Sequence, residues 1–461
     1  MLAPGSYKNK KVCVFGLGRS GCASALALQE AGASVVGWDD IAERRQHAEN
    51  VGITLEEKFK GDVLLPAPGV PLTHPQPHPV ITRARDDGME IIGDIELFQQ
   101  VLNEQNAGAE WIAITGTNGK TTTAALATHM LEQANFEIAL GGNIGTPAMS
   151  LPPPRRKLVY VLEVSSFQIA LTRSLAPNIA IQLNITPDHI DRHGTLQEYA
   201  AVKARLFARL GRGRGKSVAI IGIDDAPGRT LFEKLRSQKN IRIIALALEE
   251  ANLPPTLGSV RVQNAKLIDN IKPAESGCYD IKGVTSLIGT HNYQNIAAAF
   301  AIGRVYGLPG AQILKCFNGF KPPQHRMEQI ASINAVTFIN DSKATNANAA
   351  ARSLECFDKI HWIVGGVPKA EGIKPLRAFF PKVKQAYIIG TAQEEFAPLF
   401  KECGVLHNCY GNLRDATINA ASNASPGDVV LLAPACASFD QFADFEARGD
   451  AFRDIVERLA Q

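Results

Sequence analysis

The residues best suited to chemistry lie in the stretch Gly116-Thr-Asn-Gly-Lys-Thr121, between a short apolar run and a helix-forming segment. Gly116 and Gly119 let the backbone fold close to an anion, and the N–H groups that open the next helix point toward that anion. Lys120 would face the β- and γ-phosphates of a nucleotide, and the Thr121 hydroxyl would be a ligand of Mg²⁺. A turn with a surface lysine would need this run of phosphate-suited residues by chance. The stretch therefore predicts a nucleotide-binding strand, loop and helix.

Polar residues follow two strand-like runs downstream of that loop. Glu163 comes after Tyr160-Val-Leu162, and Asp188 and His189 come after the run that ends at Thr186. Glu163 could instead cap a helix or pair with a cation, and His189 could be a hydrogen-bonded loop histidine. Because strands that alternate with helices predict a mostly parallel sheet, ligand groups should gather at the carboxyl ends of its strands. Several polar strand ends after one phosphate loop favour a magnesium–nucleotide site.

A second glycine pattern, Gly16-Leu-Gly-Arg-Ser-Gly21, follows the strand-like run that ends at Phe15. Asp39 ends the next strand-like run, where an acid that binds a ribose would lie, so the segment satisfies the dinucleotide-binding fingerprint. Taken alone, it indicates an NAD-dependent oxidoreductase. The glycines predict only a backbone nest for a diphosphate at a helix N-terminus, and a UDP-sugar carries a diphosphate too.

The composition is that of a globular protein with several domains. The chain has 461 residues, 45% hydrophobic and 20% charged, and a formal net charge of +3. This length predicts about three domains, and the small net charge argues against nucleic-acid or membrane binding. Eight cysteines without C-x-x-C spacing favour reduced thiols and a cytoplasmic location. The chain has neither the apolar core of a secretion signal nor a run long enough to span a bilayer.

The pattern of strands and helices predicts an α/β protein of three units. Residues 1–99 form a Rossmann-like unit, and residues 100–322 form a parallel sheet that carries the phosphate loop. Residues 323–461 form a second Rossmann-like unit, again with polar loops after its strands, and the proline pair at 322 and 323 indicates a hinge before it.

The motifs and their order resemble the ATP-dependent Mur ligases of bacterial cell-wall synthesis. The motifs that carry the resemblance are Gly116-Thr-Asn-Gly-Lys-Thr121, Glu163-Val-Ser-Ser-Phe-Gln168, Asn184-Ile-Thr-Pro-Asp-His189, His291-Asn292, His325-Arg326 and Asp341-Ser-Lys-Ala-Thr-Asn346. A further group resembles the branch of the family that joins D-glutamate to UDP-N-acetylmuramoyl-L-alanine: Gly93-Asp-Ile-Glu-Leu-Phe98, Gly141-Gly-Asn-Ile-Gly145, Ser438-Phe-Asp-Gln-Phe442 and Arg448-Gly449. The resemblance covers essentially the whole chain.

The resemblance implies an amide ligase that uses ATP, two Mg²⁺ ions and an acyl-phosphate intermediate. It implies catalytic roles for Lys120, Glu163, His189 and Lys203, and metal binding by Thr121, Glu163, His189 and a carboxylated Lys203. It assigns ATP to Gly116, Thr117, Asn118, Gly119, Lys120, Thr121, Thr122, Asn292, Arg326 and Asp341. The UDP-sugar would contact Ser20, Asp39, Gly69 and Asn143, and D-glutamate would contact Thr345, Lys369, Ser438 and Phe445. Periodicity alone would make Lys203 a solvated surface lysine.

Rival functions remain open at this point. Another Mur ligase or a folylpolyglutamate synthase would share the central motifs but would not be expected to share Pro434-Ala-Cys-Ala-Ser438. An NAD dehydrogenase would give the phosphate loop no function, and a nucleotide sensor without catalysis would give Lys203 none. We expect a cytoplasmic monomer that binds UDP-N-acetylmuramoyl-L-alanine and D-glutamate.

Overall fold

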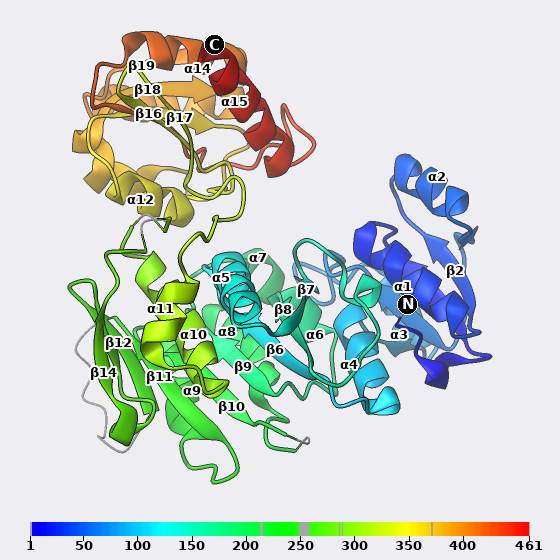
Figure 1. The fold of residues 1–461 in the computed structure, drawn as a ribbon. Coiled ribbons are helices and arrows are strands. Elements are labelled where there is room, and N and C mark those ends of the chain that lie inside the picture. The colour runs from blue at the N-terminus through cyan, green and yellow to red at the C-terminus, as the bar shows by residue number, and fades with distance from the viewer. Residues whose placement is uncertain are drawn as a thin grey trace. The chain divides into compact units, whose positions relative to one another are not determined.

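A computed structural model describes residues 2–212, 215–248, 258–284, 286–287, 289–369 and 372–460. The fold is α/β, with three sheets whose strands are mostly parallel (Figure 1). The chain forms two compact units, of which one comprises Met1–Val284 with Tyr293–Gly319 and the other Thr285–Asn292 with Phe320–Gln461. Two of the three sheets belong to the first unit.

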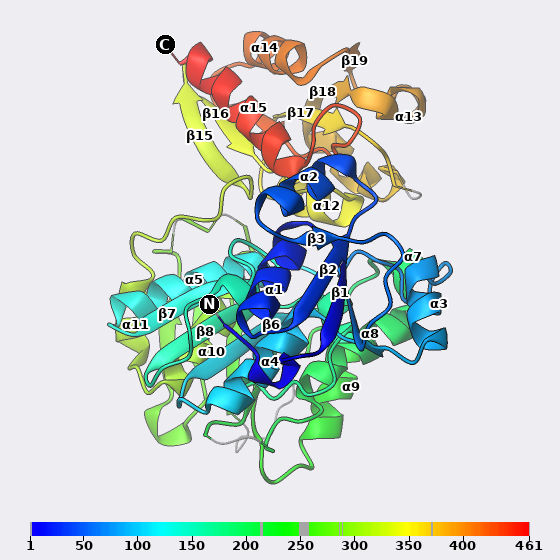
Figure 2. The ribbon, with the colours of Figure 1, turned by 90° about the vertical axis from the view of Figure 1, so that its right-hand side faces the viewer.

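The N-terminal sheet is the predicted Rossmann-like element. Its five strands are all parallel, in the order β3-β2-β1-β4-β5. They are β1 (Lys11–Phe15), β2 (Ser34–Trp38), β3 (Thr54–Leu55), β4 (Val63–Pro66) and β5 (Glu90–Ile91). The helices of this part are α1 (Arg19–Glu30), α2 (Ala42–Asn50), α3 (Pro79–Asp86) and α4 (Asp94–Gln105). Helix α1 lies along β1 and β2, so the glycine turn between β1 and α1 is at the carboxyl end of the sheet (Figure 2).

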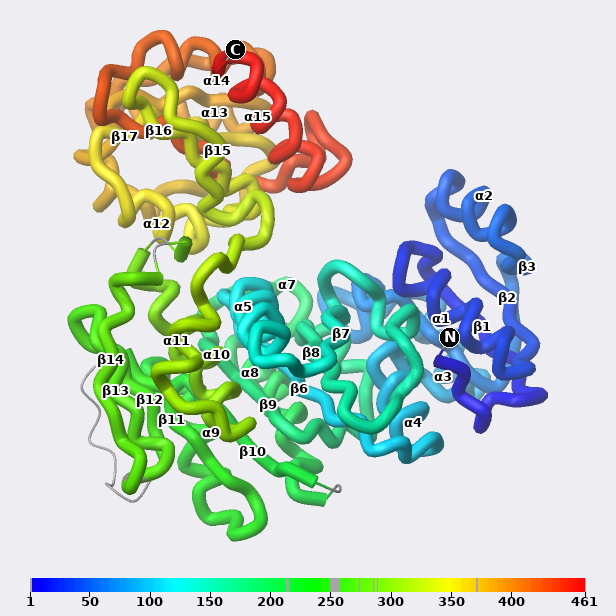
Figure 3. Tube along the Cα trace, in the orientation of Figure 1, coloured from blue at the N-terminus to red at the C-terminus, as the bar shows by residue number. Residues whose placement is uncertain are grey.

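The central sheet has nine strands in the order β14-β13-β12-β11-β10-β9-β6-β8-β7. Its strands are β6 (Glu110–Thr115), β7 (Glu137–Gly142), β8 (Leu158–Glu163), β9 (Ile179–Gln182), β10 (Val218–Gly222), β11 (Arg242–Ala247), β12 (Gly258–Gln263), β13 (Lys266–Asp269) and β14 (Gly277–Asp280). The last two strands join antiparallel at one edge, where β12, β13 and β14 run side by side (Figure 3). Strand β6, which leads into the phosphate loop, lies between β8 and β9.

The helices of the central part are α5 (Lys120–Gln133), α6 (Ser166–Ala170), α7 (Ile190–His193), α8 (Leu196–Ala204), α9 (Ala226–Leu235), α10 (Asn292–Val305) and α11 (Gly310–Cys316). One hydrophobic core joins this part to the N-terminal sheet. Phe98 of α4 meets the ring of Trp111 at 5.7 Å and that of Tyr160 at 5.0 Å, both edge-on. Buried aromatic contacts of this kind explain why the first two sheets form one compact unit.

The third sheet has six strands in the order β15-β16-β20-β17-β18-β19, with only β15 antiparallel to its neighbour. Its strands are β15 (Glu328–Ile333), β16 (Val336–Asn340), β17 (Ile360–Gly365), β18 (Val383–Ile389), β19 (His407–Tyr410) and β20 (Val429–Leu432). Its helices are α12 (Ala347–Glu355), α13 (Gln393–Glu402), α14 (Leu413–Asn423) and α15 (Phe445–Leu459). Alternate residues of β17 enter two separate cores, Trp362 with α12 and α13 and Ile363 with α14 and α15, so both faces are covered.

The predicted three-unit α/β architecture agrees with these sheets, while the predicted boundaries at residues 99 and 322 stay predictions. All eight cysteines are free thiols. Among the described residues, no helix combines the length and the apolar character needed to cross a bilayer.

Candidate active site

The phosphate loop joins β6 to α5 in the central sheet, where β6 lies between β8 and β9. Gly116 and Gly119 have φ of 151° and 85°, which L side chains rarely adopt. A Cβ atom on Gly119 would lie 2.3 Å from Oδ1 of Asn295, a side chain that also accepts a hydrogen bond from the Thr123 hydroxyl at 3.1 Å. The loop therefore needs glycine for both conformation and space. The 14-residue helix α5 directs the N–H groups of its first turn toward the loop, which suits a phosphate.

Lys120 turns its ammonium back onto its own loop. Its Nζ atom donates to the carbonyl oxygens of Gly116 at 3.0 Å and Thr117 at 2.8 Å. Asn118 is held from the other side, because its N–H donates to Oδ1 of Asn184 at 3.0 Å. Asn184 begins one of the motifs of the family resemblance, but the sequence predicted no role for it. Its amide returns a hydrogen bond to the Asn118 carbonyl at 3.2 Å, so it braces the loop.

Thr121 and Glu163 meet beside the loop. The Thr121 hydroxyl donates to Oε2 of Glu163 at 2.7 Å, and the Asn143 amide donates to Oε1 of the same carboxylate at 2.8 Å. Glu163 is only 2% exposed. A hydroxyl and a carboxylate oxygen side by side are hard donors of the kind that Mg²⁺ prefers. Thr122, also buried, lies next on α5. Asn143, predicted to contact the UDP-sugar, is thus placed next to Glu163.

Lys203 is buried beneath the phosphate loop. It is 1% exposed, and its Nζ atom donates to the Thr115 hydroxyl at 3.2 Å and to the Gly116 carbonyl at 3.0 Å. The surface position that periodicity favoured for this lysine is therefore wrong. Burial, and after it the Lys120 ammonium, holds the pKa of Lys203 well below its ordinary value. The neutral amine is thereby favoured, which is the form that can react with CO₂.

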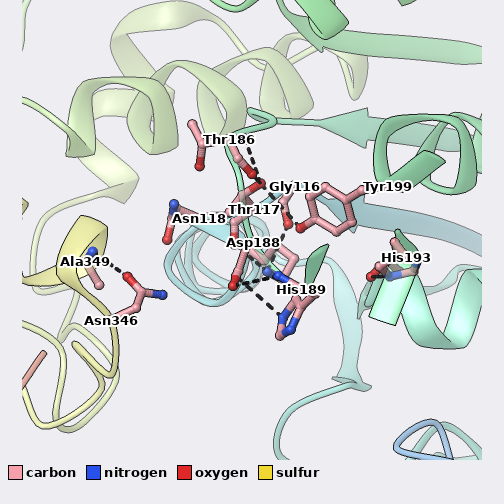
Figure 4. Close-up of polar contacts among 12 residues, drawn as sticks. Gly116, Thr117, Asn118, Thr186, Asp188, His189, His193, Tyr199, Asn346 and Ala349 are labelled. Atoms are coloured by element: carbon pink, nitrogen blue, oxygen red, sulfur yellow. Dashed lines mark hydrogen bonds and ion pairs between the residues drawn. The ribbon is translucent and has the colours of Figure 1, made fainter. Parts of the chain in front are cut away.

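His189 immediately precedes α7 and lies beside Asp188 near the phosphate loop (Figure 4). It has a φ of 54°, in the left-handed region, and its Nε2 atom lies 3.5 Å from Oδ2 of Asp188. Tyr199 connects it to the loop, because the two rings lie 6.4 Å apart and the Tyr199 hydroxyl is 3.3 Å from the Thr117 hydroxyl. The side chain of His189 is 41% exposed, so its imidazole is accessible to a ligand.

Sequence reasoning missed His193, at the other end of α7. Its ring stacks on Phe167 with centroids 5.4 Å apart, and its Nε2 atom is 2.9 Å from the Ser166 hydroxyl. Burial, with smaller effects of nearby cations, lowers the pKa of His193 to about 4, so the imidazole is neutral and packs against Tyr199 at 5.2 Å. Its only sequence signal was its place four residues after His189.

The N-terminal sheet carries three of the four residues predicted to bind the UDP-sugar, namely Ser20, Asp39 and Gly69. Asp39 is buried, and its carboxylate accepts hydrogen bonds from the N–H groups of Leu17 at 2.7 Å and Ile41 at 2.9 Å. It therefore closes the glycine turn. Ser20 lies in the first turn of α1, and Gly69 lies in the loop after β4, where an added Cβ would meet open space. Both positions are at the carboxyl end of this sheet.

The loop after β16 contains two more predicted residues, Asp341 and Thr345. Asp341 accepts a hydrogen bond from the Ser353 hydroxyl, and burial raises the pKa of Asp341 to about 6 against the opposing effects of that bond and of Arg326. Asp341 and Arg326, both assigned to ATP, thus influence each other electrostatically. Asn292, the third of this group, opens α10, where its amide lies 3.1 Å from Nε2 of His291.

The remaining predicted residues come from three loops at the carboxyl edge of the third sheet. Lys369 follows β17 and Ser438 follows β20, and these loops pair through Val367 and Ala437, which exchange hydrogen bonds of 2.9 and 3.0 Å. Phe445 begins α15, and its carbonyl accepts a hydrogen bond from the Ser342 hydroxyl at 2.8 Å. The third sheet therefore gathers Thr345, Lys369, Ser438 and Phe445 at one edge.

The structure brings the predicted residues together as three groups, one at each sheet. Among the described residues, no cluster of three or more His, Cys, Asp or Glu side chains is arranged to hold a metal ion. The assigned Mg²⁺ ligands, which include a threonine and a lysine, stay predictions, as do the individual substrate contacts.

Comparisons with known proteins agree with the resemblance seen in the motifs. Residues 114–303 match the Mur ligase middle domain, and residues 325–436 match the Mur ligase glutamate ligase domain. A UDP-N-acetylmuramoylalanine–D-glutamate ligase of Mesorhizobium japonicum is 45% identical over 472 residues, which are 100% of this chain and 98% of that protein. One of the same name from Nitrobacter hamburgensis is 43% identical over 469 residues, again 100% and 98% of the two chains.

Solved structures extend this likeness to the fold. The UDP-N-acetylmuramate–alanine ligase of Thermotoga maritima superposes with a TM-score of 0.61 at 18% identity, over 98% of this chain and 99% of the other. A pseudomurein peptide ligase type C of Methanothermus fervidus gives a TM-score of 0.56 at 18% identity, over 98% and 100%.

Proposed function

The chain belongs to the Mur ligase family, and we propose that it is an ATP-dependent ligase that joins D-glutamate to UDP-N-acetylmuramoyl-L-alanine in peptidoglycan precursor synthesis. The observation that carries the proposal is the full-length likeness to relatives of that name. The phosphate loop, with the Thr121 hydroxyl 2.7 Å from Glu163, supplies matching chemistry. We further propose that the protein works as a monomer in the cytoplasm.

The reaction needs activation because a carboxylate does not form an amide with an amine at neutral pH. The L-alanyl carboxylate of the precursor attacks the γ-phosphorus of ATP, ADP leaves, and an acyl phosphate forms. The amine of D-glutamate then attacks the acyl carbon to give a tetrahedral intermediate. Collapse of that intermediate breaks the bond between carbon and the phosphate oxygen, releases phosphate and a proton, and leaves the amide. Every step gathers negative charge at one place, so electrostatic stabilisation must dominate catalysis.

The residues of the central sheet suit that demand. Lys120, whose ammonium contacts its own loop carbonyls, would face the β- and γ-phosphates, and the N–H groups at the start of α5 would bind the same oxygens. Thr121 and Glu163 would hold one Mg²⁺, and His189 with a carboxylated Lys203 would hold a second. These ions supply positive charge to the phosphates. Lys203 fits a carbamate because burial favours its neutral amine, which can take up CO₂ and release a proton.

The substrates would occupy the other two sheets. The UDP-sugar would lie at the glycine turn near Asp39, with Ser20, Gly69 and Asn143 as further contacts. The adenosine part of ATP would contact Asn292, Arg326 and Asp341. D-glutamate would lie at the edge formed by Thr345, Lys369, Ser438 and Phe445, where the Lys369 ammonium is a natural partner for a carboxylate.

The test is phosphate release from ATP by the full-length protein with UDP-N-acetylmuramoyl-L-alanine and one of three acceptors. We expect turnover with D-glutamate and background rates with L-lysine and L-alanine. Equal turnover with another acceptor, or release that needs no acceptor, would contradict the proposal. A titration of NADH fluorescence is a second check on the N-terminal sheet. Saturable NADH binding that the precursor does not displace would favour an oxidoreductase.

A further inference from the structure

Arg448 of α15 is a buried cation whose charge the side chains of Cys436 and Asp440 offset only in part. It is 1% exposed, and in the described part of the chain no carboxylate lies within ion-pair distance of it. Its Nε atom donates to the Ser342 hydroxyl at 3.0 Å. Its Nη2 atom donates to the carbonyl oxygens of Ser342 at 2.9 Å and Cys436 at 3.2 Å. Its Nη1 atom is buried and has no hydrogen-bond partner among the described residues.

This arrangement is unfavourable for stability alone. A buried ion loses its hydration, and carbonyl and hydroxyl dipoles replace only part of it. Burial lowers the pKa of Arg448 to about 10, so the guanidinium is still charged at neutral pH. A buried apolar side chain in the same place would avoid this desolvation. An arginine that remains charged, buried and incompletely hydrogen-bonded therefore points to a role beyond packing.

The contacts of Arg448 join three segments of the third sheet's part of the chain, of which the one with Ser342 lies 106 residues before Arg448. Ser342 lies in the loop after β16, Cys436 lies in the loop after β20, and Arg448 itself lies on α15. The Ser342 hydroxyl accepts from Arg448 and donates onward to the Phe445 carbonyl at 2.8 Å, so one hydroxyl holds the loop after β16 against the first turn of α15 at two points. The N–H of Ala435 donates to the carbonyl of Ala344 at 2.8 Å and closes the two loops against each other.

The same three segments carry residues assigned to the acceptor. Thr345 lies three residues after Ser342, Ser438 lies two residues after Cys436, and Phe445 lies three residues before Arg448. We propose that Arg448 is a positioning residue for the acceptor amino acid, holding the loops after β16 and β20 and the start of α15 in the arrangement that binds the acceptor's carboxylates. This inference rests on the proposed function.

The test compares Arg448→Lys and Ser342→Ala with a control on the same helix, Arg453→Ala. Arg453 pairs with Glu328 at 2.7 Å and is partly exposed, so its loss removes an ion pair of α15 without touching the two loops. The KM values for D-glutamate, ATP and the UDP-precursor are measured with full-length proteins, and urea unfolding gives the stability of each.

We expect Arg448→Lys and Ser342→Ala to raise the KM for D-glutamate about tenfold, as the loss of one hydrogen bond to a charged group would give. The KM values for ATP and the precursor should stay within about twofold, and Arg453→Ala should match the wild type in all of them. If Arg448→Lys does not fold, Ser342→Ala still tests the inference, because this variant keeps the Arg448 guanidinium and removes a single hydroxyl.

Two results would overturn the inference. A lower stability with an unchanged KM for D-glutamate would make Arg448 purely structural, and an equal rise in all KM values would show a general disturbance. The failure of the proposed function looks different, because the wild-type protein would then not use D-glutamate at all.

Discussion

Replacing Lys203 with methionine should separate stability from activity. Methionine has nearly the length of lysine and fills the same buried space, but it has no amino group that could donate a hydrogen bond. The variant loses the hydrogen bonds of Nζ to Thr115 at 3.2 Å and to Gly116 at 3.0 Å. Each of these is worth about 1–2 kcal/mol. The variant also no longer has to bury the Lys203 amine, which is 1% exposed. An amine that is charged in the unfolded chain must either lose its proton or lose its hydration when it is buried, and either change costs several kcal/mol.

The two effects nearly cancel, so the free energy of unfolding of Lys203→Met should equal that of the wild type or exceed it by about 1–2 kcal/mol. Urea unfolding without Mg²⁺ and in CO₂-free buffer measures this, because the wild type then carries the free amine. Phosphate release should fall by about 10³-fold or more, equivalent to about 4 kcal/mol in the barrier, because an anionic metal ligand is lost.

Other substitutions at the same position test the carbamate itself. Lys203→Arg should be inactive, since a guanidinium stays charged and cannot take up CO₂. Lys203→Ala should lose nearly all activity and regain part of it when a small carboxylate such as formate is added. Wild-type turnover by the methionine or arginine variant would refute the reasoning. So would a large loss of stability in the methionine variant with activity retained.

Three further predictions concern the other sites. Lys120→Ala should abolish phosphate release, because the activation barrier should rise by about 3 kcal/mol or more. The affinity for the UDP-precursor, measured by calorimetry, should stay nearly unchanged. Normal turnover by this variant would contradict the assignment of the phosphate loop. Lys369→Ala should raise the KM for D-glutamate far more than that for ATP, and an unchanged value would move the role to Ser438 or Thr345. Burial raises the pKa of Asp341 to about 6, so the folded state binds a proton on this carboxyl more tightly than the unfolded state does. The protonated carboxyl therefore contributes fully to stability below about pH 4, and this contribution is lost as the pH rises through about 6. Urea unfolding from pH 4 to 7 should show this loss in the wild type and not in Asp341→Asn, and parallel pH profiles would contradict it.

The motifs predicted from the sequence were those in which local pattern and chemistry coincide. The phosphate loop needs glycines at fixed positions next to a strand and a helix, and that requirement is visible in one short stretch. Parallel strands such as β9 and β20 are continuous apolar runs because both faces are buried, so they too could be found. The edge strand β19 could not, because it begins with His407 and Asn408 and gains its strand character only by pairing with β18.

Burial and pairing over long distances were beyond the sequence. Lys203 looked like a surface residue because its burial depends on Thr115 and Gly116, which lie 88 and 87 residues earlier. The stack of His193 on Phe167 and the contacts of Arg448 likewise join segments that only the fold brings together. Patterns within one helix carry no signal for such partners.

The transfer of oxygen from substrate to phosphate tests the central claim most directly. UDP-N-acetylmuramoyl-L-alanine labelled with ¹⁸O in its L-alanyl carboxylate is incubated with ATP, Mg²⁺, D-glutamate and the full-length protein, and the released phosphate is analysed by mass spectrometry. Our account predicts one ¹⁸O atom in each phosphate formed, because the carboxylate oxygen that attacks ATP leaves with the phosphate when the amide forms. Phosphate without ¹⁸O, released at the same rate as the amide, would contradict the acyl-phosphate route.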